Sequence, residues 1–369
     1  EPDEELPLAI TITPRQVERL RLIRGTRGAR LIPYDRFYNV AQVADPGELV
    51  EMPEGVAAVR NEYGVFEFED PEVELTSKGL PLECTPVRTD VADGYNVYFG
   101  DLHTHSGFSN DCIEREKNTR TPGELYDYAR NVAAADFLCV TDHHQPWDVP
   151  RNRIGRDLWE RSVGAAREHN APGDFVAFNG FEYRDKRGDT AVVLGEDLDY
   201  DVIDNPEMER VDRFWDIMDG RDYVTIPHFH NGGGLDDGEW ISTPDKAIEP
   251  VLEIYSCHGS FEGPKDEINE RNTPEIKWRR PDRNGRYFLR QGYRYGFVCN
   301  SDGHKGVVAN NGLTAVLARD LSRESILEAL RARRCYGTTN ARIRLVFSIN
   351  GSLMGSELPL TPERSIRIE

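Results

Sequence analysis

The sequence lacks any apolar run near the length that crosses a bilayer, and it lacks an opening basic-then-apolar signal segment. Basic residues are also in deficit, because 45 Lys and Arg stand against 65 Asp and Glu, giving a formal net charge of −20. This charge disfavours nucleic acid or an anionic membrane as the main partner, since both are recognised by a basic surface. The chain begins at Glu1 rather than Met, which leaves a removed leader open.

Cysteine is scarce and shows no short paired spacing. The six residues are Cys84, Cys112, Cys139, Cys257, Cys299 and Cys335. Cys139 and Cys299 lie in apolar, strand-like runs, which favours buried free thiols in a reducing compartment, the cytoplasm, over disulfides. A glycine-rich dinucleotide fingerprint is also missing after the first α/β strand, so an oxidoreductase of that kind fits poorly.

The length of 369 residues allows two or three domains, or one barrel with an accessory piece. Residues 1–95 carry short β-rich runs (8–13, 55–60, 65–68 and 72–76) and predict a mostly β accessory region. Residues 96–340 alternate strands with helices, interrupted by a long polar insertion at 259–295 that we expect to be a loop. Residues 341–369 return to strand-like alternation, and they either pair with the N-terminal region or begin a truncated domain.

Seven strands are predicted in the central region, at 96–99, 137–141, 175–179, 191–194, 223–226, 251–255 and 296–300. Helices are expected at 121–134, 156–169, 206–218 and 322–334, the first opened by the capping box Thr121-Pro-Gly-Glu124. Near-continuous apolar strands between helices favour a parallel α/β barrel, closed or nearly closed, with strands buried on both faces.

The nine histidines are unevenly placed, since none lies in the first 102 residues or the last 65. Five of the seven predicted strands are followed by histidine, and another is followed by Glu182. The strand ends read D-L-H-T-H (101–105), D-H-H (142–144), H-F-H (228–230), S-C-H (256–258) and S-D-G-H (301–304). Because the carboxyl ends of barrel strands converge on one face, these side chains predict a shared metal site.

The number of ligands indicates more than one ion. Five or more imidazoles with two or three carboxylates exceed the four ligands of a single Zn²⁺, so two or three divalent ions (Zn, Mn or Fe) are expected. A carboxylate such as Glu182 can bridge two ions, which together activate a shared water. This is hydrolytic chemistry, and phosphate esters are the natural substrates because cations absorb charge on the phosphoryl oxygens.

These motifs resemble a known family. D-L-H-T-H-S-G-F-S (101–109), T-D-H (141–143), G-F-E (180–182), I-P-H (226–228) and N-S-D-G-H (300–304) resemble, in the right order, the polymerase and histidinol phosphatase (PHP) superfamily. The flanking segments resemble a poorly characterised branch in which a β-rich segment precedes G-D-L-H. The resemblance covers roughly residues 95–340 and implies a distorted seven-stranded (β/α) barrel. It also implies phosphoester hydrolysis by a metal-bound hydroxide.

By position, the resemblance implies eight metal ligands: His103, His105, Asp111, His143, Glu182, His228, Asp302 and His304. One departure stands out, because the family usually has another histidine soon after the bridging glutamate, where this chain has Gly188-Asp189-Thr190. Asp189 replaces it, His230 or His258 fills in, or the ion on that side is weak or absent. Two or three ions therefore both remain open.

Other residues near the motifs are candidates for substrate binding or proton transfer. His258 and His230 are the candidate catalytic residues, and Arg184 and Lys305 are the candidates to hold an anionic group. His144 is expected to be a solvated neighbour of the site or a substrate contact. Asp101 and Asp142 are expected either to orient ligand imidazoles or to form turns.

Three functions compete at this stage. The first is a metal-dependent phosphoesterase acting on a small, phosphorylated substrate, with neither nucleic acid nor membrane as partner. The second keeps the metals but cleaves an amide or another C–N or C–O bond, because ligand motifs do not encode the scissile bond. The third is a non-catalytic barrel that only binds a ligand, for which Asp189 at the usual histidine position is the sole support.

Overall fold

The computed structural model describes residues 94–146, 152–185, 188–228, 249–263, 284–309, 311–339 and 341–368, and five short strands before them. The chain divides into two compact units, Glu1–Asp90 and Val91–Glu369. The first unit contains two small antiparallel sheets, β1-β4-β3 and β2-β5. Their strands are β1 (Arg30–Leu31), β2 (Val50–Glu51), β3 (Ala58–Arg60), β4 (Phe66–Phe68) and β5 (Thr76–Ser77). Three of these coincide with or overlap expected runs, whereas run 8–13 lies outside the described residues.

The second unit is built on a seven-stranded sheet in the order β10-β9-β8-β7-β6-β14-β15. Its strands are β6 (Asn96–Asp101), β7 (Phe137–Val140), β8 (Val176–Asp185), β9 (Gly188–Leu194), β10 (Tyr223–His228), β14 (Leu313–Ala318) and β15 (Cys335–Thr338). The predicted α/β class with a seven-stranded sheet is confirmed. Five predicted strands join this sheet, and β14 and β15, which were not predicted, complete it.

The pairing is more antiparallel than the sequence pattern suggested. Within this sheet, β6, β7 and β8 pair in parallel, whereas β8, β9 and β10 are antiparallel, as are β6, β14 and β15. Residues 186–187 join β8 to β9, and so short a connection permits only an antiparallel hairpin. Both strands read as buried apolar runs, so periodicity alone does not reveal their direction.

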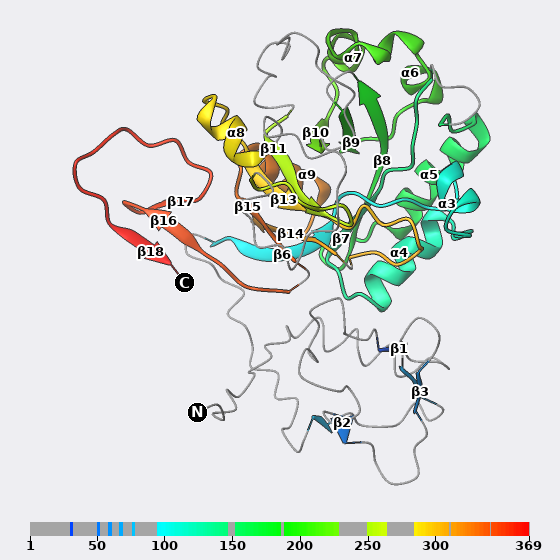
Figure 1. The fold of residues 1–369 in the computed structure, drawn as a ribbon, viewed down its shortest axis with the longest axis horizontal. Helices are drawn as coiled ribbons and strands as arrows, with labels where there is room; N and C mark the ends of the chain where they lie inside the picture. The colour runs from blue at the N-terminus through cyan, green and yellow to red at the C-terminus, as the bar shows by residue number, and fades with distance from the viewer. Residues whose placement is uncertain are drawn as a thin grey trace. The chain divides into compact units, whose positions relative to one another are not determined.

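A second sheet curls the barrel toward closure. It contains β12 (Gly259–Ser260), β11 (Val251–Ser256) and β13 (Gly296–Cys299), with β11 and β13 parallel. β11 lies beside β10 and β13 lies beside β15, so the small sheet stands between the two edges of the large one. Figure 1 labels these strands, and the ends of β6, β7, β8, β10, β11 and β13 supply the motif residues.

Eight helices lie in the described part of the second unit. They are α3 (Asn110–Glu114), α4 (Pro122–Asn131), α5 (Arg156–His169), α6 (Tyr200–Ile203), η2 (Pro206–Glu209), α7 (Val211–Met218), α8 (Gly285–Arg290) and α9 (Arg323–Arg331). The capping box of Thr121 and Glu124 is present, and α4 packs beside α5. The helix expected at 206–218 is divided, because Arg210 is extended (φ −96°, ψ 124°) between η2 and α7.

Flanking segments also take definite form. The described parts of 259–295 include β12 and α8, so this region is not wholly a loop. At the C-terminus, β16 (Phe347–Ile349) pairs with β17 (Ser352–Leu353) and β18 (Ile366–Ile368). The five cysteines within the described residues are free thiols, and Cys139 and Cys299 are buried as predicted. Among the described residues, no helix has the length and apolar character needed to span a membrane.

Gly180 in β8 tests how tightly the sheet is packed beneath Glu182. A Cβ at Gly180 would lie 2.3 Å from the Val192 carbonyl oxygen and 2.7 Å from Cys139 Sγ. We expect Gly180→Ala to lower the free energy of unfolding by roughly 3 kcal/mol in urea titrations, because backbone cannot yield cheaply. Gly164→Ala in α5 is the control: its Cβ meets nothing within 4 Å, so a gain of roughly 0.5–1 kcal/mol is expected. Equal effects at the two positions would contradict the prediction.

Candidate metal centre

The carboxyl ends of the strands are joined by backbone hydrogen bonds that bring the motifs together. Bridges link Thr104 to Gly303 and His143 to Glu182. The Asp302 amide donates to the His103 carbonyl (2.8 Å), and the His105 amide donates to the Gly303 carbonyl (3.0 Å). Segments almost 200 residues apart in sequence are therefore held at one edge of the barrel.

Two buried aspartates hold the backbone of these loops. Asp101 accepts from the amides of His103, Ser301 and Ala309. Burial raises the pKa of Asp101 to about 6, although these hydrogen bonds oppose the shift. Asp142 accepts from the Ser106 amide and from the Ser106 and Ser109 hydroxyls. Both aspartates thus fix loop geometry, which corresponds to the turn-forming alternative.

Four side chains form a tetrad with the dimensions of one coordination shell. His105 Nε2 lies 3.2 Å from both Glu182 Oε2 and Asp302 Oδ1. His103 Nε2 lies 3.4 Å from Asp302 Oδ1 and 3.7 Å from Glu182 Oε2. Ligand atoms held at roughly 2.1 Å from a tetrahedral ion are separated by roughly 3.4 Å, so this tetrad fits a divalent ion.

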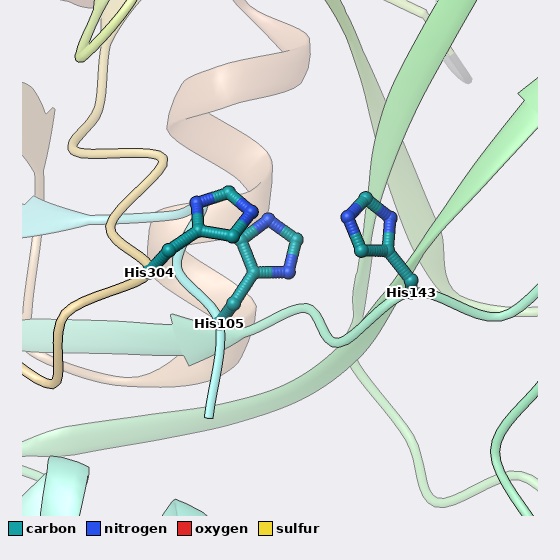
Figure 2. Close-up of side chains that lie close together, drawn as sticks. All are labelled: His105, His143 and His304. Carbon is teal, nitrogen blue, oxygen red and sulfur yellow. The ribbon is translucent and has the colours of Figure 1, made fainter. Parts of the chain in front are cut away.

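A second group lies beside the tetrad. Asp111 Oδ2 is 3.3 Å from His143 Nε2 and 3.2 Å from His304 Nε2. His105 stacks on His143 and on His304, with ring centroids 4.5 and 4.2 Å apart. Figure 2 shows these three imidazoles together on three separate segments of the chain. Asp111, His143 and His304 thus form a triad that also fits an ion.

Several polar atoms at the centre have no hydrogen-bond partner within the described structure. These buried atoms are His103 Nε2, His143 Nδ1 and Glu182 Oε2. His143 Nδ1 and Glu182 Oε2 are only 2.9 Å apart, yet their geometry does not form a hydrogen bond. Buried polar groups are rarely left unsatisfied, and atoms crowded in this way are arranged as ligands are around cations.

The electrostatics of the cluster are strongly coupled. Burial alone would lower the pKa of His103, but Asp302 and Glu253 outweigh it and hold this pKa well above its usual value. The pKa of His143 is likewise raised by Glu182 and Asp111 against the effect of burial. Conversely, nearby imidazoles hold the pKa of Glu182 well below its usual value, although burial opposes this. The buried carboxylates of the cluster therefore favour positive charge at the neighbouring imidazoles.

The side near His228 differs from the other two groups. His228 Nε2 lies 2.6 Å from Glu182 Oε1, the oxygen that faces away from the tetrad pairs. Asp189 is opposite His228 in the β9–β10 register, but both its carboxylate oxygens accept from Arg184. The Asp189 carboxylate is thus paired with the Arg184 guanidinium through both of its oxygens.

The remaining candidate residues are placed as follows. His258 Nε2 lies 3.0 Å from Asp302 Oδ2, and its side chain is 38% exposed, so it is accessible to solvent. Lys305 is 76% exposed and lies 3.7 Å from Glu116 rather than from the imidazole cluster. His230 lies outside the described residues. The proposed ligands are thus brought together, whereas the two cations lie against carboxylates of their own.

Sequence reasoning missed Glu253, a buried carboxylate in β11. Its Oε2 lies 3.1 Å from His103 Nδ1 and accepts from Asn300 Nδ2 at 2.8 Å. Together with His103 and His228 it forms a further group whose possible ligand atoms all lie within 4.8 Å of one another. The available signal was a single charged residue inside the apolar run V-L-E-I-Y.

His144 was expected to be solvated or to contact substrate, and that expectation is wrong. It is buried, its Nδ1 accepts from the Ile154 amide, and its Nε2 faces the Ile203 carbonyl at 3.1 Å. Burial lowers the pKa of His144 to about 4. The residue therefore packs as a neutral imidazole.

This pKa predicts acid sensitivity. A histidine in the unfolded chain is protonated as the pH falls below about 6.5. His144 in the folded protein stays neutral until the pH approaches 4, so lowering the pH between these values favours the unfolded chain. We expect metal-free protein to lose roughly 2 kcal/mol from this residue between pH 7 and pH 5. Urea titrations at both values should show a smaller loss for His144→Asn, after allowing for its lower stability at pH 7. An identical pH dependence in the two proteins would refute the assignment.

No protein-family model matches the chain. An uncharacterized protein of Chlamydia pneumoniae is 24% identical over 312 residues, which cover 81% of this chain and 48% of that protein. An uncharacterized protein of Chlamydia muridarum is 36% identical over 122 residues, covering 30% of this chain and 20% of that protein. The chain thus spans about half the length of the first relative.

Two solved structures are similar to this chain. A two-domain protein from Bacteroides vulgatus, containing a predicted PHP-like metal-dependent phosphoesterase, is 16% identical with a TM-score of 0.40, covering 68% of this chain and 67% of its own. PsfC from Pseudomonas syringae is 14% identical with a TM-score of 0.38, covering 67% of this chain and 93% of its own.

Proposed function

We propose that this protein is a metal-dependent hydrolase of PHP type, and that it cleaves small phosphate esters. The observation that carries the proposal is the tetrad of His103, His105, Glu182 and Asp302, whose ligand atoms lie 3.2 to 3.7 Å apart. The adjacent triad of Asp111, His143 and His304 supports a second ion, and the group around His228 supports a third. Zn, Mn and Fe all suit these imidazole and carboxylate ligands.

The residues divide the work in the proposed reaction. Bound divalent ions supply Lewis acidity, which activates water and neutralises charge on the phosphoryl oxygens. Glu182 Oε2 contacts the tetrad histidines and Oε1 contacts His228, so this carboxylate would help to hold ions on both sides. Half-exposed His258 would transfer a proton to the leaving group, and its contact with Asp302 would orient it. His230 stays a second candidate for this role.

Substrate binding is proposed from the chemistry of the centre. A phosphoryl group is dianionic, so the ions themselves would be its main counter-charge. Arg184 and Lys305 remain the candidates to hold the anionic group, although in the substrate-free protein they contact Asp189 and Glu116. Binding would then require each cation to exchange its carboxylate for the substrate.

The competing reaction is amide or other C–N or C–O bond hydrolysis at the same centre. Metal ligands do not specify the scissile bond, so metal-loaded protein should be assayed against phosphate monoesters, phosphodiesters and amides. Turnover of phosphate esters that is lost with a chelator and restored by Zn²⁺ or Mn²⁺ is the expected result. Phosphatase silence with amide turnover would favour the alternative. Less than one ion per chain after reconstitution would instead favour a binding protein without catalysis.

A further inference from the structure

We propose that Glu253 is a positioning residue that holds the His103 imidazole with its proton on Nδ1, leaving the Nε2 lone pair for the metal tetrad. The inference rests on the proposed metal centre, but it concerns a residue outside the ligand set implied by the motifs. Glu253 lies on β11, whereas His103 follows β6, so only the folded barrel brings them together.

The direction of each hydrogen bond follows from one unambiguous donor. The Leu102 backbone amide donates to Asn300 Oδ1 at 2.9 Å, which fixes the oxygen side of the Asn300 amide. The Thr314 hydroxyl lies 3.0 Å from the same oxygen. Asn300 Nδ2 must therefore face Glu253, and it donates to Glu253 Oε2 at 2.8 Å.

The same oxygen then determines the state of His103. Glu253 Oε2 lies 3.1 Å from His103 Nδ1, and a carboxylate oxygen can only accept. Nδ1 must therefore carry the proton, and in a neutral imidazole Nε2 is then unprotonated. His103 Nε2 is the atom that lies 3.4 Å from Asp302 Oδ1 and has no hydrogen-bond partner. This series of hydrogen bonds, from the Leu102 amide through Asn300 and Glu253 to His103, thus directs the Nε2 lone pair toward the tetrad.

Both Glu253 and Asn300 are buried, so their hydrogen bonds to one another and to His103 are protected from competition with water. Glu253 is 2% exposed and Asn300 is fully buried, so the carboxylate is shielded from water. A buried carboxylate is costly unless it is compensated, and hydrogen bonding to a ligand imidazole raises the basicity of that ligand. The other oxygen, Glu253 Oε1, has no hydrogen-bond partner within the described structure. The alternative is that Glu253 binds a metal directly through Oε1, and the experiment must distinguish this role from positioning of His103.

The experiment compares Glu253→Gln and Glu253→Leu with wild type and with Glu249→Gln. Glu249 is a matched control, since it is equally buried just before β11 but contacts Tyr295 at 2.9 Å. Zn²⁺ affinity is measured by chelator competition, ions per chain by elemental analysis at saturation, and the His103 tautomer by ¹⁵N NMR of histidine-labelled, Zn-loaded protein. Thermal unfolding verifies that each variant is folded.

We expect Glu253→Leu to weaken the tightest Zn²⁺ by roughly 10–100-fold without changing the number bound at saturation. Its His103 should lack the protected Nδ1 proton signal that we expect in wild type. Glu253→Gln should weaken binding less and keep that proton, because its amide oxygen still accepts from Nδ1; this variant decides the question if Glu253→Leu does not fold. Glu249→Gln should match wild type.

Loss of a whole ion from either Glu253 variant at saturating Zn²⁺ would overturn the proposal in favour of direct ligation. Unchanged affinity and unchanged NMR signals in both variants would overturn it in favour of a purely structural carboxylate. None of these measurements uses a substrate. A wild-type protein that binds its ions normally but hydrolyses nothing would therefore refute the proposed function and leave this inference standing.

Discussion

Replacing Glu182 by alanine is expected to abolish metal loading and to reduce the hydrolysis rate by more than roughly 100-fold. Removing a residue that only orients a metal ligand typically reduces activity by roughly 10–100-fold, and Glu182 is itself a proposed ligand. The reason is its position, because Glu182 contacts four imidazoles, those of His103, His105, His143 and His228. The substitution therefore removes the carboxylate that these four imidazoles share. Elemental analysis and steady-state kinetics on reconstituted protein measure the two effects.

Asp302→Ala should have a similar effect, since Asp302 Oδ1 completes the tetrad with His103 and His105. Asp302 also holds a left-handed backbone conformation (φ 47°), a strained geometry that is tolerated where function demands it. Glu168→Ala is the control, because Glu168 is exposed on α5 and should leave both metal content and rate unchanged. A fully active Asp302→Ala protein would contradict the proposed function.

The pH dependence of protein stability is expected to have opposite signs in the metal-free and the metal-loaded protein. In metal-free protein the raised pKa values of His103 and His143 stabilise the fold below about pH 6.5, where unfolded histidine is also protonated. This stabilisation is lost as the pH rises through the folded pKa values. The lowered pKa values of Glu182 and Asp302 act at the acid end, where stability is lost as the pH falls below about 4.

Bound metal should show the opposite trend, because ions compete with protons for the same imidazoles. With free ion at about 1,000 times Kd, binding should add roughly 4 kcal/mol at pH 8 and much less at pH 6 for the same ion concentration. Urea titrations of loaded and chelator-treated protein measure this gap. Calorimetry in buffers of different ionisation enthalpy should also detect proton release. A gap that is equal at pH 6 and pH 8 would refute the coupling.

Local sequence signals predicted most of the candidate ligands, whereas Asp111 came from the family resemblance alone. Two histidines at i and i+2, as at His103 and His105, project to one side of an extended chain. Strand ends that carry polar residues after apolar runs converge in an α/β fold, and the structure brings all eight proposed ligands into one cluster. The α4 capping box and the start of α9 at Ser322 were predictable for the same local reason.

Contacts between distant segments were not predictable. Asp189 stood where a histidine was expected, and only the β8–β9 hairpin revealed that Arg184 occupies both of its oxygens. His144 adjoins a candidate ligand yet points into the core, because neighbouring residues at a strand end face opposite ways. β14 and β15 escaped prediction although they complete the sheet.

The sequence by itself determined the kind of chemistry available, because residue type sets which atoms can bind a cation and strand periodicity sets which side they face. Tertiary structure decided how those atoms are grouped and which protonation state they hold. Glu253 illustrates the difference, since its role depends on His103 and Asn300, 150 and 47 residues away. Periodicity describes neighbours along the chain, whereas hydrogen bonds and coordination depend on distances that only the folded barrel fixes.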